Sequence, residues 1–135
     1  MRPQPLLRVR EVEASSRWYQ RLLALESAHG GSSYERLVWG DQLVLQLHDW
    51  KVEHDHGPIG DPKKLHGNGM LLWFEVDDFE AVAARAAEMS AEVVRPRHRN
   101  PEKGPGGPNH WELWLRDPDG YTVVVASPDG TAGAG

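Results

Sequence analysis

The chain has 135 residues, no cysteine and a formal net charge of −5, from 20 acidic and 15 basic residues. This length fits one compact domain or two small modules that share a core, and the acidic balance argues against nucleic acid as the main partner. Without cysteine there is no disulfide, thiolate metal ligand or cysteine nucleophile, and without a membrane-length apolar run or a signal-peptide core we expect a cytoplasmic protein with no membrane partner.

The first half of the chain is predicted to form a strand, a helix and further strands. An apolar strand over residues 6–9 leads to Glu11, where an acidic side chain suits the free N–H groups of a helix start. A helical apolar pattern follows as far as Leu23. Residues 34–39 and 42–48 have the composition of strands.

The second half repeats the same order. The segment Val9-Arg-Glu-Val-Glu-Ala has a counterpart in Val76-Asp-Asp-Phe-Glu-Ala, 67 positions later. A repeat at half the chain length indicates two similar structural units. The second unit is predicted to contain a strand at 70–76, a helix that opens at Asp78, and strands at 91–95, 111–115 and 121–126.

Composition divides the chain into four parts. We expect a first module over residues 1–50, a connector rich in glycine and proline over 51–69, a second module over 70–127 and a flexible tail over 128–135. Residues 96–109 contain several prolines and glycines and are predicted to be irregular. The connector histidines are expected to be solvated; they are His54, His56 and His66.

A hairpin is predicted where Arg-Asp-Pro-Asp-Gly separates two strands. Proline and glycine at these positions favour a three-residue loop over 118–120. That loop places Trp114 opposite Val124 and Glu112 opposite Ala126. His110, Glu112 and Trp114 should therefore share one face of the sheet.

Three segments resemble the vicinal oxygen chelate superfamily, which includes glyoxalase I, extradiol dioxygenases and bleomycin-resistance proteins. They are the opening Val9-x-Glu-Val-Glu-x-Ser-x-x-Trp-Tyr19, its repeat at Val76-x-Asp78, and the closing hairpin 115–125. The resemblance implies an α+β fold in which two βαβββ modules form a half-open, eight-stranded barrel around a cavity. It also implies a homodimer, and Pro3 and Pro5 place the first strand at an edge or a junction.

The resemblance also implies four metal-ligand positions, which fall on Gln4, Gln46, Leu71 and Val124. Leucine and valine cannot ligate a divalent ion. We therefore expect no cofactor at the usual site. A divalent metal held instead by His48, His110 and Glu112 is the alternative. These three side chains could also simply hydrogen-bond one another or a ligand.

Strand alternation places further side chains beside the expected cavity. His48 shares parity with Gln46, and Trp73 and Glu75 share parity with Leu71. Two facing indoles could hold a flat aromatic group, although ordinary core packing explains them equally well. The predicted ligand-binding residues are Gln46, His48, Trp73, Glu75, His110, Glu112 and Trp114.

Three functions agree with these features. The first is sequestration of a small aromatic molecule, such as an antibiotic, without a catalytic metal; inward carboxylates would favour a cationic ligand. The second is a lyase, isomerase or dioxygenase of the same superfamily, with an unusual metal site or with His48 or Glu112 as acid or base. The third is a structural or regulatory module without a small ligand.

Overall fold

The computed structural model describes residues 2–51 and 61–133. The chain divides into two compact units, Met1–His66 (unit 1) and Gly67–Gly135 (unit 2). Two of the predicted loop histidines, His54 and His56, lie outside the described residues.

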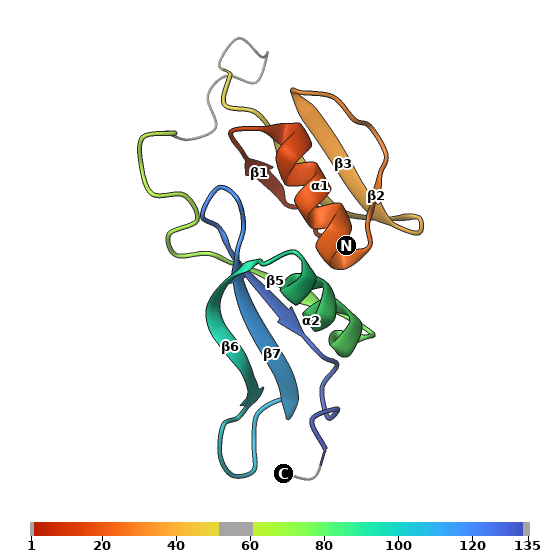
Figure 1. Cartoon of the computed structure of the whole chain (residues 1–135), viewed down its shortest axis with the longest axis vertical. Coiled ribbons are helices and arrows are strands. Elements are labelled where there is room, and N and C mark those ends of the chain that lie inside the picture. Colours follow the sequence, from red (N-terminus) through yellow and green to blue (C-terminus); the bar gives the residue numbers. More distant parts are fainter. Residues whose placement is uncertain (1, 52–60, 134–135) are drawn as a thin grey trace. The chain divides into compact units, whose positions relative to one another are not determined.

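Unit 1 contains one helix packed on a four-stranded sheet (Figure 1). The strand order is β1-β4-β3-β2, with β1 parallel to β4 and the other neighbours antiparallel. The elements are β1 (Leu6–Arg8), α1 (Val12–Leu23), β2 (Glu26–Ser27), β3 (Tyr34–Trp39) and β4 (Gln42–His48).

Unit 2 has the same architecture. Its strand order is β5-β8-β7-β6, again with one parallel pair, β5 and β8, followed by antiparallel pairs. The elements are β5 (Leu71–Glu75), α2 (Phe79–Glu88), β6 (Glu92–Asn100), β7 (His110–Arg116) and β8 (Thr122–Ala126).

The two βαβββ modules and the α+β fold predicted from the repeat are confirmed. Each module forms its own sheet, and the described strands include no hydrogen-bonded pair that joins the two sheets. The edge position predicted for the first strand is confirmed as well, since β1 lies at the end of its sheet. The arrangement of both sheets around a shared cavity stays a prediction.

A buried carboxylate ties α1 to its sheet. Glu35 on β3 is 3% exposed and accepts hydrogen bonds from Ser16 Oγ on α1 at 2.8 Å, Ser27 Oγ at 2.7 Å and the Gly30 N–H at 2.8 Å. Burial raises the pKa of Glu35, but these donors and the Arg36 N–H outweigh it and lower the pKa below its usual value. Glu35 therefore acts as a structural anchor on the helix side of this sheet.

The helix of unit 2 begins as its sequence predicts. Asp78 is the N-cap of α2, and its side chain accepts a hydrogen bond from the Ala81 N–H at 3.0 Å. Phe79, Val82 and Ala86 are buried on the inner side of the helix. A residue with φ of 51°, Ser90, then turns the chain from α2 into β6.

The predicted hairpin is also confirmed. The Asp117 N–H donates to the Tyr121 carbonyl at 2.9 Å, and Gly120 has a φ of 99° that suits glycine. Trp114 pairs with Val124 and Glu112 with Ala126. The register of β7 and β8 is therefore the predicted one.

The end predicted for the preceding strand was wrong. The sequence indicates that β6 stops at Arg95, but the strand continues to Asn100 through Pro96. Proline fits because β6 is an edge strand and contains two register shifts, between Val93 and Arg95 and between Arg95 and His98. The short strand β2 was missed entirely.

The last described residues of unit 2 are hydrogen-bonded to the segment just before β7. The Gly130 N–H donates to the Pro108 carbonyl at 2.8 Å, and the Ala132 N–H donates to the Asn109 carbonyl at 3.0 Å. The flexibility expected of the tail stays a prediction.

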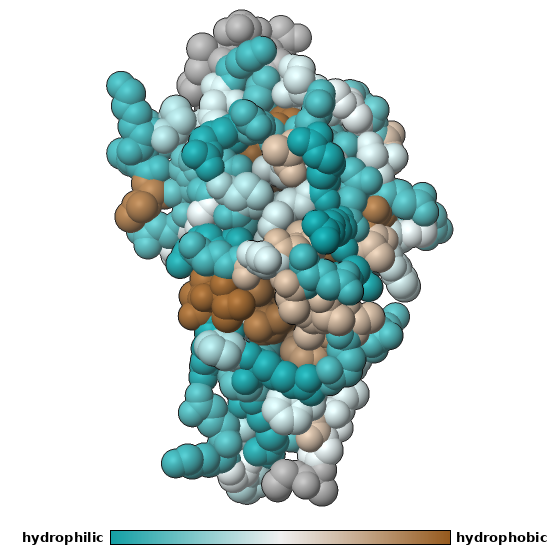
Figure 2. All heavy atoms as spheres, viewed as in Figure 1, coloured by the Kyte–Doolittle hydropathy of each residue, from teal (hydrophilic) through white to brown (hydrophobic). Residues whose placement is uncertain are grey.

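The surface view in Figure 2 is mostly hydrophilic, with apolar side chains gathered in patches. The exposed large apolar side chains of the described residues are Leu6, Trp39, Leu65, Met70, Leu71, Trp73, Val93 and Val94. None of the described helices is long and apolar enough to cross a membrane.

Replacement of Gly67 by alanine should destabilise unit 2 strongly. Gly67 has a φ of +71°, and a Cβ atom there would lie 2.6 Å from Cδ1 and 3.3 Å from Cα of Tyr121. Gly69 has a φ of +83° but open space around its Cβ position. Gly69→Ala should thus cost only the backbone strain of about 1 kcal/mol, whereas Gly67→Ala should cost about 1–3 kcal/mol more through the clash. Equal urea midpoints for the two variants would contradict this contact.

Candidate functional site

One face of the unit 2 sheet, which we call the site face, carries most of the predicted site residues. Opposed residues of neighbouring strands share a face, so the register assigns its members. They are Leu71, Trp73 and Glu75 of β5, Thr122, Val124 and Ala126 of β8, His110, Glu112, Trp114 and Arg116 of β7, and Glu92, Arg95, His98 and Asn100 of β6.

The other face of this sheet packs on α2. Arg97 lies over the rings of Phe79 on α2 and Trp111 on β7, with its Cζ 5.1 and 4.7 Å from the ring centroids. It also pairs with Glu80 on α2 at 2.5 Å. Trp111, which the sequence left unassigned, is therefore a helix-side residue.

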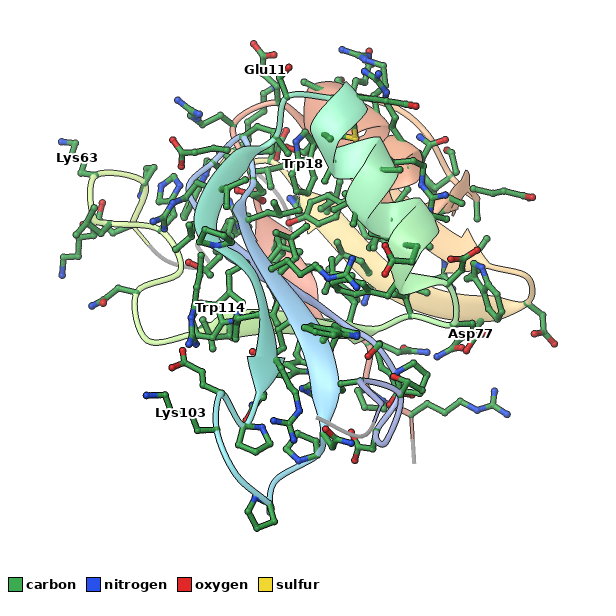
Figure 3. The ribbon with its side chains drawn as sticks, turned by 60° about the horizontal axis from the view of Figure 1, so that its bottom comes forward. Glu11, Trp18, Lys63, Asp77, Lys103 and Trp114 are labelled. Carbon is green, nitrogen blue, oxygen red and sulfur yellow. The ribbon has the colours of Figure 1, made fainter. Side chains whose placement is uncertain are left out.

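Two tryptophans flank a valine in one row across the site face. Trp73 pairs with Val124, and Val124 pairs with Trp114. The indoles are two strand spacings apart, about 10 Å between backbones, with Val124 between them. Trp73 is 45% exposed, while Trp114, labelled in Figure 3, is half-buried. Val124 is fully buried, so the two indoles, which we call the aromatic walls, are the accessible part of this row.

A buried carboxylate organises the polar part of the site face. Glu112 is 1% exposed. Its Oε1 accepts from His98 Nε2 at 3.1 Å and Trp114 Nε1 at 2.9 Å, and its Oε2 accepts from Asn100 Nδ2 at 2.7 Å and His110 Nε2 at 2.7 Å. Four donors fill the acceptor positions of a carboxylate. Of the alternatives considered for His110 and Glu112, the structure shows hydrogen bonding between the two side chains.

These donors keep Glu112 ionised. Burial alone raises its pKa, but the hydrogen bonds from Asn100, Trp114 and His110, together with the charge of His98, lower the pKa to about 2. A carboxylate with so low a pKa and no free acceptor position is poorly suited to exchange protons near neutral pH. Glu112 is therefore a positioning residue, which weakens its candidacy as an acid or base.

Both histidines are held at their second nitrogen as well. His98 Nδ1 lies 2.9 Å from the Pro96 carbonyl, and His110 Nδ1 lies 3.2 Å from Oδ1 of Asp129. The His110 ring is also 6.0 Å from the ring of Trp73, centroid to centroid. The polar network is thereby continuous with the aromatic row.

Unit 1 carries the other predicted site residues. Gln46 accepts from the Tyr34 hydroxyl at 2.5 Å and donates to the Gln4 carbonyl at 3.0 Å. His48 is buried beside Asp49, whose Oδ1 is 3.3 Å from His48 Nδ1. Gln46 and His48 share a face of their own sheet, opposite Arg36 and Tyr34 on β3. Whether they join the unit 2 site stays a prediction.

The four positions implied by the family resemblance do not fit a divalent metal. Leu71 and Val124 offer no ligating atom, and the amide oxygen and nitrogen of the Gln46 side chain are both hydrogen-bonded. Among residues 2–51 and 61–133, no group of three or more His, Asp or Glu side chains is arranged to hold a metal ion.

A sequence model of the Glyoxalase/Bleomycin resistance protein/Dioxygenase superfamily matches residues 3–125. The chain belongs to this superfamily. No curated relative matches it.

Several solved structures resemble the chain. A protein of unknown function from Agrobacterium tumefaciens str. C58 has a TM-score of 0.72 and 22% identity, over 94% of each chain. Lactoylglutathione lyase from A. tumefaciens has a TM-score of 0.64 and 19% identity, over 92% of this chain and 90% of that one. The fosfomycin resistance protein FosX from Mesorhizobium loti has a TM-score of 0.63 and 14% identity, over 97% of this chain and 93% of that one. At these identities the likeness shows the fold alone.

Sequence reasoning found part of this superfamily member's site and missed the rest. It placed His110, Glu112 and Trp114 on one face of the sheet and Trp73 beside the expected cavity, and the structure puts all four on the same face. It does not find the β6 residues that complete the network, because the prolines and glycines of residues 96–109 predict an irregular segment. The available signal was the alternation of His98 and Asn100, which matches that of His110 and Glu112.

Glu112→Gln should reduce the stability of the folded protein in a pH-dependent way. The folded pKa of about 2 lies below the ordinary value of 4.5, so the carboxylate stabilises fully above pH 4.5, and this contribution is lost as pH falls toward 2. The gap in unfolding free energy between wild type and variant should be about 3 kcal/mol at pH 7 and should narrow below pH 4.5.

Urea unfolding at pH 7, 4.5 and 3 measures this gap. Glu75→Gln is the matched control, because Glu75 is an exposed carboxylate on the same face. The control should change stability little at any of these pH values. A gap for Glu112→Gln that stays constant from pH 7 to pH 3 would show that the buried charge does not stabilise the fold.

Proposed function

We propose that this protein binds a flat aromatic small molecule on the site face of unit 2 and sequesters it without a metal at the family's usual positions. The aromatic row Trp73–Val124–Trp114 carries this proposal. It offers two partly exposed indoles on either side of the buried Val124, and indoles favour stacked contacts with planar groups. Sequestration of an antibiotic is the form of this function that we favour.

The polar network supports the same role. Glu112 fixes the indole N–H of Trp114 and the rings of His98 and His110. A binding face whose side chains are held before the ligand arrives loses less conformational entropy on binding. Gln46 and His48 are proposed as further polar contacts, contributed by unit 1.

An enzyme of the same superfamily is the second candidate. The solved structures of similar fold include a lactoylglutathione lyase and a fosfomycin resistance protein. Since Glu112 has no free acceptor position, His48 is the stronger acid–base candidate for a reaction without a metal. Equilibrium dialysis followed by metal analysis separates the two functions. Stoichiometric zinc, nickel, manganese or iron, with turnover of a 2-oxoaldehyde–thiol adduct or a catechol, would favour the enzyme.

Truncation of the aromatic walls should weaken ligand binding. Stacking on each indole is worth about 0.5–1.5 kcal/mol beyond area burial, so Trp73→Ala combined with Trp114→Ala should raise Kd by roughly one to two decades. Tryptophan fluorescence against a panel of aromatic antibiotics and related natural products measures this. Trp114→Phe keeps an aromatic wall but loses the N–H donor to Glu112, so it should weaken binding less than Trp114→Ala.

Trp39→Ala is the matched control for this experiment. Trp39 is 55% exposed at the end of β3 in unit 1 and lies outside the site face. Its removal should leave Kd unchanged. If a ligand binds equally well to wild type and to the Trp73, Trp114 double variant, the binding face is not the one proposed.

We also propose that the protein forms a homodimer. The support is the family resemblance, together with the edge strands β1 and β5 that end the two sheets. Leu6 on β1 and Leu71 on β5 are 37% and 45% exposed, which leaves apolar surface near these edges for a partner to cover. Sedimentation velocity at micromolar concentration should give twice the mass of 15.1 kDa; a single monomeric species would refute the dimer.

A further inference from the structure

We propose that the ligand of the site face carries an anionic group such as a carboxylate beside its aromatic ring, and that Arg95 binds this group. The inference rests on the proposed function, because it assigns a charge to the same ligand. It replaces the cationic ligand that the sequence favours, and the reason lies in residues of β6 that the sequence placed in a loop.

The buried carboxylate cannot serve a cationic ligand. Glu112 is 1% exposed, and all four of its hydrogen bonds come from β6 and β7 of its own unit. A ligand cation would have to displace one of these donors and leave it unpaired, which is costly in a buried site. The negative charge that motivated a cationic ligand is therefore already satisfied.

Arg95 places a guanidinium beside the aromatic row. It pairs with Trp114 across β6 and β7, and its Cζ lies 5.7 Å from the centroid of a Trp114 ring. A guanidinium stacked on an indole is positioned next to any ring that contacts the same indole. Its planar fork matches the two oxygens of a carboxylate.

The present partner of Arg95 is easily replaced. Arg95 pairs with Glu102 in the loop after β6, and their side chains are 40% and 65% exposed. Exposed pairs of this kind contribute little to stability. A ligand carboxylate could therefore take the place of Glu102 on Arg95 at small cost.

A second guanidinium lies on the other side of Trp114. Arg116 follows two residues later on the same face. Its Nη1 donates to the Gly120 carbonyl and to Thr122 Oγ1, each at 3.2 Å. Its Nε lies 3.3 Å from Glu92, whose side chain is 69% exposed. Two arginines thus border Trp114. The exposed carboxylate Glu75 lies two strands away on β5, where a cationic ligand would have to bind.

Three probes that differ in charge test the proposal: 2-naphthoate, 2-naphthamide and 2-naphthylmethylamine. Their Kd values are measured by tryptophan fluorescence on the full chain. Wild type should bind naphthoate at least about fivefold more tightly than naphthamide, and the amine more weakly than the amide. The preference should shrink as salt increases, because part of the site is exposed to solvent.

Arg95→Gln should bring the naphthoate and naphthamide Kd values together without weakening naphthamide. Arg97→Gln removes the same charge from the same strand but on the helix side, so it should keep the preference. Urea midpoints of both variants verify folding, and Arg95→Lys, which keeps the charge, should restore part of the preference.

Each other outcome is decisive. Equal binding of naphthoate and naphthamide to wild type would overturn the anionic ligand and leave the aromatic site intact. Tightest binding of the amine, abolished by Glu75→Gln, would restore the cationic ligand. If Arg97→Gln also loses the preference for naphthoate, the preference comes from the overall charge of the protein and not from a contact with Arg95. Failure of all three probes to bind would refute the proposed function together with this inference.

Discussion

The site face of unit 2 depends on one buried charge. Glu112 lies in the middle of β7, where an unpaired carboxylate would be costly, and it is tolerated because four donors converge on it. Two donors come from β6 and two from β7, so the carboxylate also fixes how the edge strand sits on its neighbour. Removal of the carboxylate would leave four donors without their acceptor. Glu112 and these four side chains therefore form one coupled hydrogen-bond network.

The two modules use a buried carboxylate in opposite ways. In unit 1, Glu35 points toward the helix and joins α1 to β3 through Ser16. In unit 2, Glu112 lies on the face away from α2 and holds the half-buried Trp114 and the largely buried rings of His98 and His110. The same topology thus supports a structural anchor in one copy and the proposed binding face in the other, where the ordered polar groups lie next to the partly exposed indoles.

The sequence predicts the modules because their signals are local. Acidic residues at helix starts, alternation in β3 and β4, and the hairpin loop each act within a few residues, and the hairpin alone placed Glu112 and Trp114 on one face. The donors to Glu112 from β6 could not be predicted in this way. Strict alternation from Glu92 puts Arg95 on the opposite face from His98, and only two inserted residues in the strand bring both to Glu112 and Trp114. Pro96 lies within the strand that contains these donors, and a proline at that position predicts a loop.

The register shifts of β6 also separate charges that are neighbours in sequence. Arg95 contacts Trp114 on the site face, whereas Arg97 contacts Trp111 and Phe79 on the helix side, although two residues apart in an ordinary strand would share a face. If the same segment paired with β7 without the extra residue between Arg95 and His98, Arg95 and Arg97 would share a face of the sheet. Relatives with the same residues in β6 but without this bulge would therefore present a different charge pattern on this face, so the position of the bulge deserves as much weight as residue identity when they are compared.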